Sequence, residues 1–212
     1  MNFPFFASFL VFILVLQHNL RKGKKAQELN EAAYWNHEFS ANEIRKHSLD
    51  DLIYVTFQAD TFYPIKLLDD KSCPLFLEKN PEVKEILSRF LFLENQKIVN
   101  LTEYTNTDLK YKYGVSNLNA LTEYDTNYNE LITLLHRYGS IYVKEGYETQ
   151  ALSILEYAVS IGTDISGTYL LLADIYQKNQ QHDKIQWLKK EAEKISTSRK
   201  DSIIRKLQEF NL

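Results

Sequence analysis

Apolar side chains in the last third of the chain recur at every third or fourth position, which places them on one face of a helix. The strongest run leads in from Leu118 and continues to Tyr142, through Leu121, Tyr124, Tyr128, Leu131, Leu135 and Tyr138. It predicts a helix over about residues 128–144. Gly146 is predicted to end this helix, because glycine accepts the left-handed backbone conformation found at helix C-termini.

The same spacing predicts further helices after Gly146. One runs over about residues 148–161 and is closed by Gly162. The next begins near Ser166, and the pattern breaks at 179–182 before it resumes as far as Ile195. A last amphipathic helix carries Ile203, Leu207 and Phe210. The pattern therefore predicts two helix pairs followed by one terminal helix.

A set of six small and large residues repeats after 34 positions. The first copy is Gly139, Tyr142, Gly146, Ala151, Leu155 and Ala158, and the second is Ala173, Tyr176, Gln180, Ile185, Lys189 and Ala192. This arrangement resembles the tetratricopeptide repeat family over about 80 residues. The second copy departs from the family at Gln180, Ile185 and Lys189, where a turn glycine, an alanine and a large apolar residue are usual. The layout also resembles small, single-pass bacterial membrane proteins that carry a short stack of such repeats and have no assigned activity.

The resemblance implies a binding surface, because in this family the first helix of each pair lines a concave face. At the corresponding positions this chain has Thr133, His136, Ser140, Val143, Lys144, Leu170, Asp174, Gln177 and Lys178. Members that bind chaperones hold a C-terminal carboxylate with lysine, asparagine and arginine. The matching positions here are His136, Ser140, Leu171, Asp201 and Arg205, and only Arg205 has that chemistry. Carboxylate binding is therefore not expected.

The amino terminus has the composition of a membrane segment. Residues 2–20 contain no charged side chain, and as a helix they would reach roughly 28 Å, close to the hydrocarbon thickness of a bilayer. Four basic residues follow directly, Arg21, Lys22, Lys24 and Lys25, and such clusters stay on the cytoplasmic side. We therefore expect a single-pass anchor in the cell membrane, in contact with the lipid bilayer through residues 2–20, with the C-terminal body facing the cytoplasm. A cleaved signal peptide is the alternative, although the basic start and the small-x-small cleavage site are missing.

The middle section predicts an irregular, α-rich region with little sheet. Residues 26–37 continue as a helix or form a disordered linker, and Ser40 with Glu43 has the spacing of a capping box that would start a short helix. Asn80 followed by proline predicts the start of another helix. Short strands are expected at 53–57, at 62–65 on an edge, and at 97–101, and a polar, turn-rich boundary at 105–114. The expected fold class is mainly α, with an anchor and basic flank at 1–25, a juxtamembrane and middle region at 26–115, and a helical stack at 116–212.

Charge and chemistry narrow the function. The net charge is −3, and residues 26–131 carry 18 acidic and ten basic side chains, which argues against nucleic acid. The single cysteine, Cys73, excludes an internal disulfide and is read as a buried thiol. The five histidines are isolated, and no phosphate-binding loop or nucleophile elbow is present. No catalytic residue, cofactor or metal ligand is predicted, so we do not expect an enzyme.

These observations lead to two hypotheses. The first is a membrane-anchored adaptor whose short repeat stack binds a protein or peptide partner. The alternative is a structural membrane protein that self-associates, because two repeats are fewer than the roughly three that a stable stack usually needs, and another copy could complete it.

Overall fold

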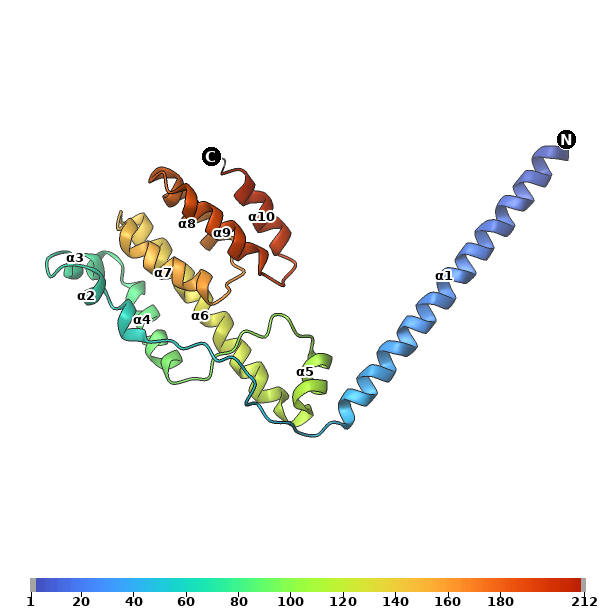
Figure 1. Ribbon diagram of the computed structural model, residues 1–212, viewed down its shortest axis with the longest axis horizontal. Coiled ribbons are helices and arrows are strands. Elements are labelled where there is room, and N and C mark those ends of the chain that lie inside the picture. Colours follow the sequence, from blue (N-terminus) through green and yellow to red (C-terminus); the bar gives the residue numbers. More distant parts are fainter. Residues whose placement is uncertain (1–2, 211–212) are drawn as a thin grey trace. The chain divides into compact units, whose positions relative to one another are not determined.

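The computed structural model describes residues 3–210, and for residues 3–11, 14 and 15 it describes the backbone alone. The described chain is 73% helix and contains no sheet, in agreement with the predicted mainly α class. It folds as two units, one formed by Met1–Ser48 with Asn106–Leu118 and the other by Leu49–Thr105 with Asn119–Leu212. Figure 1 shows the helices of both units.

The first unit consists of the long helix α1 (Phe3–Glu43), the helix α5 (Asn106–Tyr113) and the short 3-10 helix η2 (Val115–Asn117). The Glu38 carboxylate on α1 accepts hydrogen bonds from Thr107 Oγ1, at 2.6 Å, and from Lys110 Nζ. These bonds lower the pKa of Glu38 below its ordinary value, and the bond from Lys110 has a larger effect than the bond from Thr107. The expectation of a turn-rich boundary at 105–114 is thus wrong: the segment is helical because it buries Leu109 and Tyr113 within this unit.

Helix α1 also departs from the sequence prediction in its length. It continues without interruption through Ser40, whose Oγ donates to the Asn36 carbonyl at 3.0 Å. Because this hydroxyl bonds within the helix, it does not start a new one, and the predicted capping box with Glu43 is wrong.

The predicted transmembrane helix is not supported by the described residues. Among them, no helix combines the length and the apolar character that crossing a membrane requires. Most of the predicted span, residues 2–20, lies outside the described residues. Residue 2 is not described, and for residues 3–11, 14 and 15 the side chains are not described. Of the described apolar side chains in this span, Phe12, Leu16 and Leu20 are exposed.

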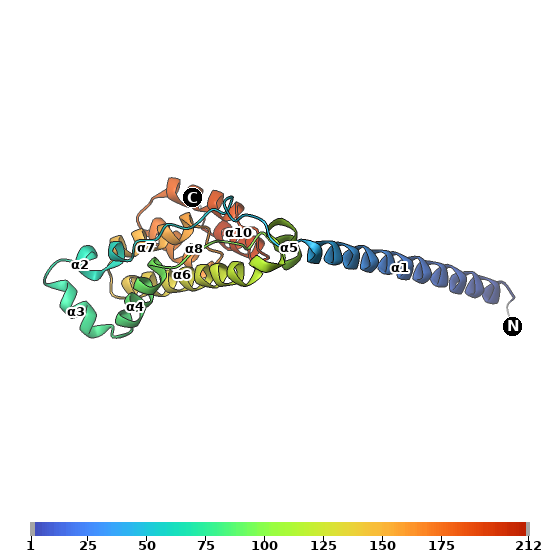
Figure 2. The same cartoon turned by 90° about the horizontal axis from the view of Figure 1, so that it is seen from below.

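The second unit contains the helical stack. It comprises α6 (Leu118–Lys144) from its second residue on, α7 (Glu148–Ser160), α8 (Ser166–Lys178), α9 (His182–Glu193) and α10 (Lys200–Gln208). Helix α7 packs against α8, α8 against α9, and α10 against both α8 and α9 (Figures 1 and 2). The predicted helix at 148–161, the start near Ser166 and the break at 179–182 are confirmed to within a residue.

Left-handed residues close three of these helices. Gly146 and Gly162 have φ of 81° and 85°, and the next residue donates its N–H back into the helix. Gln180 adopts φ of 56° and has the same arrangement, with a bond of 2.8 Å from Gln181 N to the Tyr176 carbonyl. The substitution of glycine by glutamine in the second copy therefore leaves the turn geometry intact.

Residues 49–105, the part of the middle region that belongs to the second unit, pack on the same core as the stack. They form η1 (Ala59–Phe62), α2 (Pro64–Leu67), α3 (Ser72–Lys79) and α4 (Glu82–Glu94). The rings of Phe57, Phe62 and Phe90 contact one another, and Tyr138 of α6 donates its hydroxyl to the Phe62 carbonyl at 2.7 Å. The middle region is thus a layer over α6 and α7 within one hydrophobic core.

Details of this region differ from the sequence expectations. The predicted strands at 53–57 and 97–101 are reduced to one antiparallel bridge between Tyr54 and Val99. The strand predicted at 62–65 is absent, because Phe62 ends η1, Pro64 begins α2, and only Tyr63 between them is extended. The helix expected after Asn80 is present, but the Asn80 amide donates to the Phe76 carbonyl and does not cap α4. Asparagine here closes the preceding helix α3, which the sequence pattern did not reveal.

Candidate functional site

A groove of about 750 Å³ opens between α6, α8 and the end of α10. Its lining residues are His136, Ser140, Gly167, Leu170, Leu171, Asp174, Lys206, Glu209 and Phe210. We call it the α6–α8 groove. All three helices belong to the second unit, and α10 packs directly on α8, so the groove is formed within one compact body.

The structure brings together four of the nine residues predicted to bind a partner. His136 and Ser140 come from α6, and Leu170 and Asp174 come from α8. The other five do not line the groove: Thr133, Val143, Lys144, Gln177 and Lys178. They lie on the same two helices, so the predicted face is larger than the concave part of it.

His136 forms part of the groove floor. It is half-buried, and its Nδ1 lies 3.2 Å from Oγ1 of the buried Thr168. Gly167 makes room for the ring, since a Cβ at this position would lie 2.7 Å from His136 Cε1. Burial lowers the pKa of His136 below its ordinary value of 6.5, so the imidazole is neutral at pH 7.

Some polar side chains at the groove already bond within the chain, and others can still bond to a ligand. The Ser140 hydroxyl donates to the His136 carbonyl at 2.7 Å and retains its capacity to accept a hydrogen bond. Asp174 forms an ion pair with Lys178 at 2.8 Å, and this carboxylate raises the pKa of Lys178. Both partners are more than half exposed, so the pair contributes little to stability.

Sequence reasoning missed the contribution of the C-terminal helix to the site. Lys206, Glu209 and Phe210 complete the groove, whereas Arg205, the one residue with clamp chemistry, does not line it. The spacing predicts Phe210 as part of the last amphipathic helix, but α10 ends at Gln208 and Phe210 is half-buried beyond it. The available signal was its place at the very end of an amphipathic pattern, where a helix has no further turn to cover it.

The groove offers binding surface and no evident reaction chemistry. Leu170, Leu171 and Phe210 supply apolar area, and the charged side chains lie around them. In the part of the chain that the structure describes, no group of three or more His, Cys, Asp or Glu side chains could hold a metal ion. A mixed apolar and polar groove of this kind suits a peptide or a protein side chain.

The buried imidazole makes stability depend on pH in a defined direction. Because the folded-state pKa of His136 lies below the unfolded value near 6.5, the unfolded chain takes up the proton more readily. Stability that is complete above pH 6.5 should therefore decline as the pH falls below it. Urea unfolding between pH 7.5 and 5.5 should show a smaller loss in His136→Gln than in the unsubstituted chain. The exposed His182→Gln is the control, and an equal loss in all three proteins would contradict this role of His136.

Comparison of the chain with models of known protein families, with curated proteins and with solved structures found no match.

Proposed function

We propose that this chain is an adaptor that binds a protein or peptide in the α6–α8 groove. The observation that supports it most is the convergence of His136, Ser140, Leu170 and Asp174 with Phe210, which follows α10, in one groove. The resemblance to tetratricopeptide repeats implies that these four residues belong to a binding face. The resemblance to tetratricopeptide repeats remains part of the proposal, since helix pairs of this kind act by holding other proteins.

Membrane attachment is the second part of the proposal. The uncharged segment 2–20 followed by Arg21, Lys22, Lys24 and Lys25 supports an anchor whose basic flank stays in the cytoplasm. Such an anchor would concentrate the binding groove close to the membrane surface. Extraction with alkaline carbonate should leave the full chain in the membrane pellet and release a chain that begins at residue 26. Release of both proteins would contradict the anchor without affecting the groove.

The groove is tested by two single substitutions in the full chain. Leu170→Asp places a carboxylate on the half-exposed apolar wall, and it should weaken partner capture at least about tenfold, as expected when an apolar anchor contact is lost. Lys144→Glu is the matched control, because Lys144 is exposed on α6 and outside the groove. The partner recovered by the unsubstituted chain and by Lys144→Glu, and lost by Leu170→Asp, would be identified by mass spectrometry.

Two results would count against the adaptor. Equal recovery by Leu170→Asp and Lys144→Glu would show that the groove is not the contact. Recovery of the chain itself as the sole partner, with a mass in sedimentation that rises with concentration, would favour the self-associating structural protein.

A further inference from the structure

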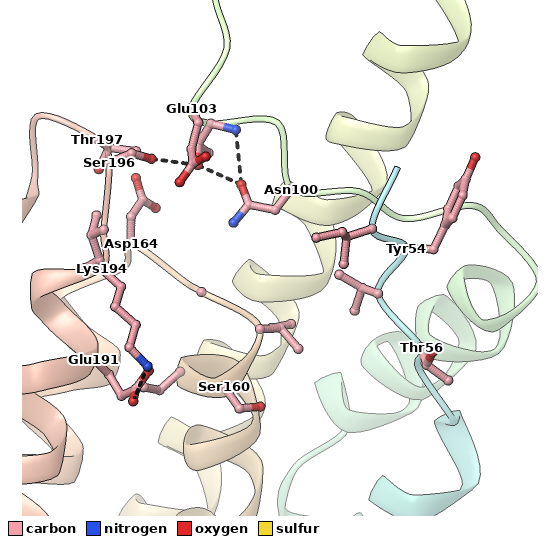
Figure 3. Close-up of a pocket in the computed structure, with 17 residues that line it drawn as sticks. Tyr54, Thr56, Asn100, Glu103, Ser160, Asp164, Glu191, Lys194, Ser196 and Thr197 are labelled. Carbon is pink, nitrogen blue, oxygen red and sulfur yellow. Dashed lines mark hydrogen bonds and ion pairs between the residues drawn. The ribbon is translucent and has the colours of Figure 1, made fainter. Parts of the chain in front are cut away.

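A second groove lies in the same unit, where α7 and α9 end, and the proposed function does not use it (Figure 3). Its volume is about 680 Å³. The extended segment 53–56 forms one wall, the loop 100–103 forms one end, and the last turns of α7 and α9 with the residues that follow them form the opposite wall. We call it the edge groove.

Only one edge of the extended segment is paired. Tyr54 forms an antiparallel bridge with Val99, and Val55 N donates to the Ile98 carbonyl at 2.9 Å. This bond places Tyr54 at the register position whose N–H and C=O point away from the paired strand. Within the described residues, neither backbone group of Tyr54 makes a hydrogen bond. The segment therefore presents one donor and one acceptor for another strand.

The free edge faces the groove. Carbonyl groups two residues apart on an extended chain point in the same direction. The Thr56 carbonyl accepts a hydrogen bond of 2.8 Å from the hydroxyl of Tyr157, which lies on α7. The Tyr54 carbonyl thus points to the side on which α7 and the edge groove lie.

The side chains that line the edge groove are partly apolar and partly acidic. Ile53 at the rim is 86% exposed and presents an apolar side chain beside the groove. The lining includes three carboxylates, Glu103 at one end and Asp164 and Glu191 on the opposite wall. Its single amine, Lys194, pairs with Glu191 at 2.7 Å. Figure 3 shows Glu103 and Asp164 near each other, beside Ser196 and Thr197.

Of the carboxylates Asp164 and Glu103, only one has a basic partner among the described residues. Asp164 forms an ion pair with Arg199 at 3.2 Å, whereas Glu103 has no ion pair within the described chain. A cationic group that enters the groove would meet Glu103 without competition from a resident amine.

We propose that the edge groove binds an extended peptide of a partner protein by strand addition to Tyr54. The peptide pairs with the Tyr54 N–H and C=O, places an apolar side chain against Ile53 and presents a lysine or arginine to Glu103. Backbone pairing supplies affinity, and the alternating apolar and basic side chains supply selectivity.

A matched pair of substitutions tests the backbone contact. The probe is a fluorescein-labelled peptide of sequence Lys-Val-Thr-Val-Thr-Val-Lys, titrated with the full chain and followed by fluorescence anisotropy. Tyr54→Pro removes an N–H that makes no internal hydrogen bond, which an edge strand tolerates, and it should weaken binding at least about tenfold. Tyr54→Ala removes the ring and keeps the N–H, and it should change binding by less than about threefold.

The charge contact is tested separately. A probe with glutamate at both lysine positions should bind at least about tenfold more weakly to the unsubstituted chain, and Glu103→Lys should reverse this preference. Leu170→Asp in the α6–α8 groove should leave binding of the probe unchanged, so failure of one groove does not affect the other.

Several outcomes would overturn this site. They are equal binding by Tyr54→Pro and Tyr54→Ala, equal binding of the two probes, and no binding up to about 1 mM. Concentration-dependent dimers that Tyr54→Pro abolishes would assign the edge to a second copy of this chain instead.

Discussion

Replacing Phe90 with alanine should lower the free energy of unfolding of the helical stack by about 3–5 kcal/mol. Phe90 is fully buried on α4, and its ring centroid lies 5.2 Å from that of Phe57 and 5.7 Å from that of Tyr138 on α6. Its removal leaves a cavity between the middle region and the stack. Urea unfolding followed by helical circular dichroism measures the loss.

Phe92→Ala is the control for Phe90→Ala on the same helix. Phe92 is 46% exposed, so its truncation should cost less than about 1 kcal/mol. A variant Phe90→Ala in which the helices of the stack unfold at the original urea concentration would show that the middle region is not part of the same cooperative unit.

The second large effect is expected at the contact between α6 and α7. Gly139→Ala should destabilise the stack by about 1–3 kcal/mol, because the added methyl would lie 2.5 Å from Cδ2 and 2.6 Å from Cγ of Leu155. Leu155 is fully buried, so a shift of its side chain would displace packed neighbours in the core. The steric loss exceeds the gain of up to about 1 kcal/mol from the better helix propensity of alanine. Thermal and urea unfolding would detect the change.

A double-substitution cycle identifies the clash as the cause. Leu155→Ala alone should cost about 2–5 kcal/mol, and the added methyl at position 139 should cost much less in that background, since the truncated side chain leaves room for it. Gly23→Ala is the positional control, because a Cβ there meets nothing within 4 Å and should not reduce stability. Strict additivity at 139 and 155 would contradict the packing explanation.

The helical stack could be predicted because its signals are local. Apolar spacing over three and four residues determines which face of a helix is buried, and Gly146 and Gly162 mark the ends with their left-handed backbone. Gln180 shows the limit of that reasoning, since the same turn forms there with a side chain that favours it less.

The prediction of α5 failed for a different reason. Its sequence is polar, and only Leu109 and Tyr113 are buried. The hydrogen bonds that Thr107 and Lys110 make to Glu38 join residues about 70 positions apart, and no local pattern reveals them.

Only part of the lining of the α6–α8 groove could be predicted from the sequence. The resemblance to tetratricopeptide repeats selected His136 and Asp174 on α6 and α8. Phe210 follows α10, whose docking the apolar spacing does not determine.

The sequence by itself determined the number of helices from α6 onward and the faces that they bury, because these depend on interactions between near neighbours along the chain. It placed the start of α6 at about residue 128, and this bound is wrong, since the helix already begins at Leu118. Only the tertiary structure decided that the middle region covers α6 and α7, and that the segment beside Tyr54 presents a free edge. The bond from Tyr157 to the Thr56 carbonyl spans 101 positions, and Phe90 meets Tyr138 across two layers. Such contacts depend on the shape and hydrogen-bonding groups of surfaces that exist only once the helices have packed.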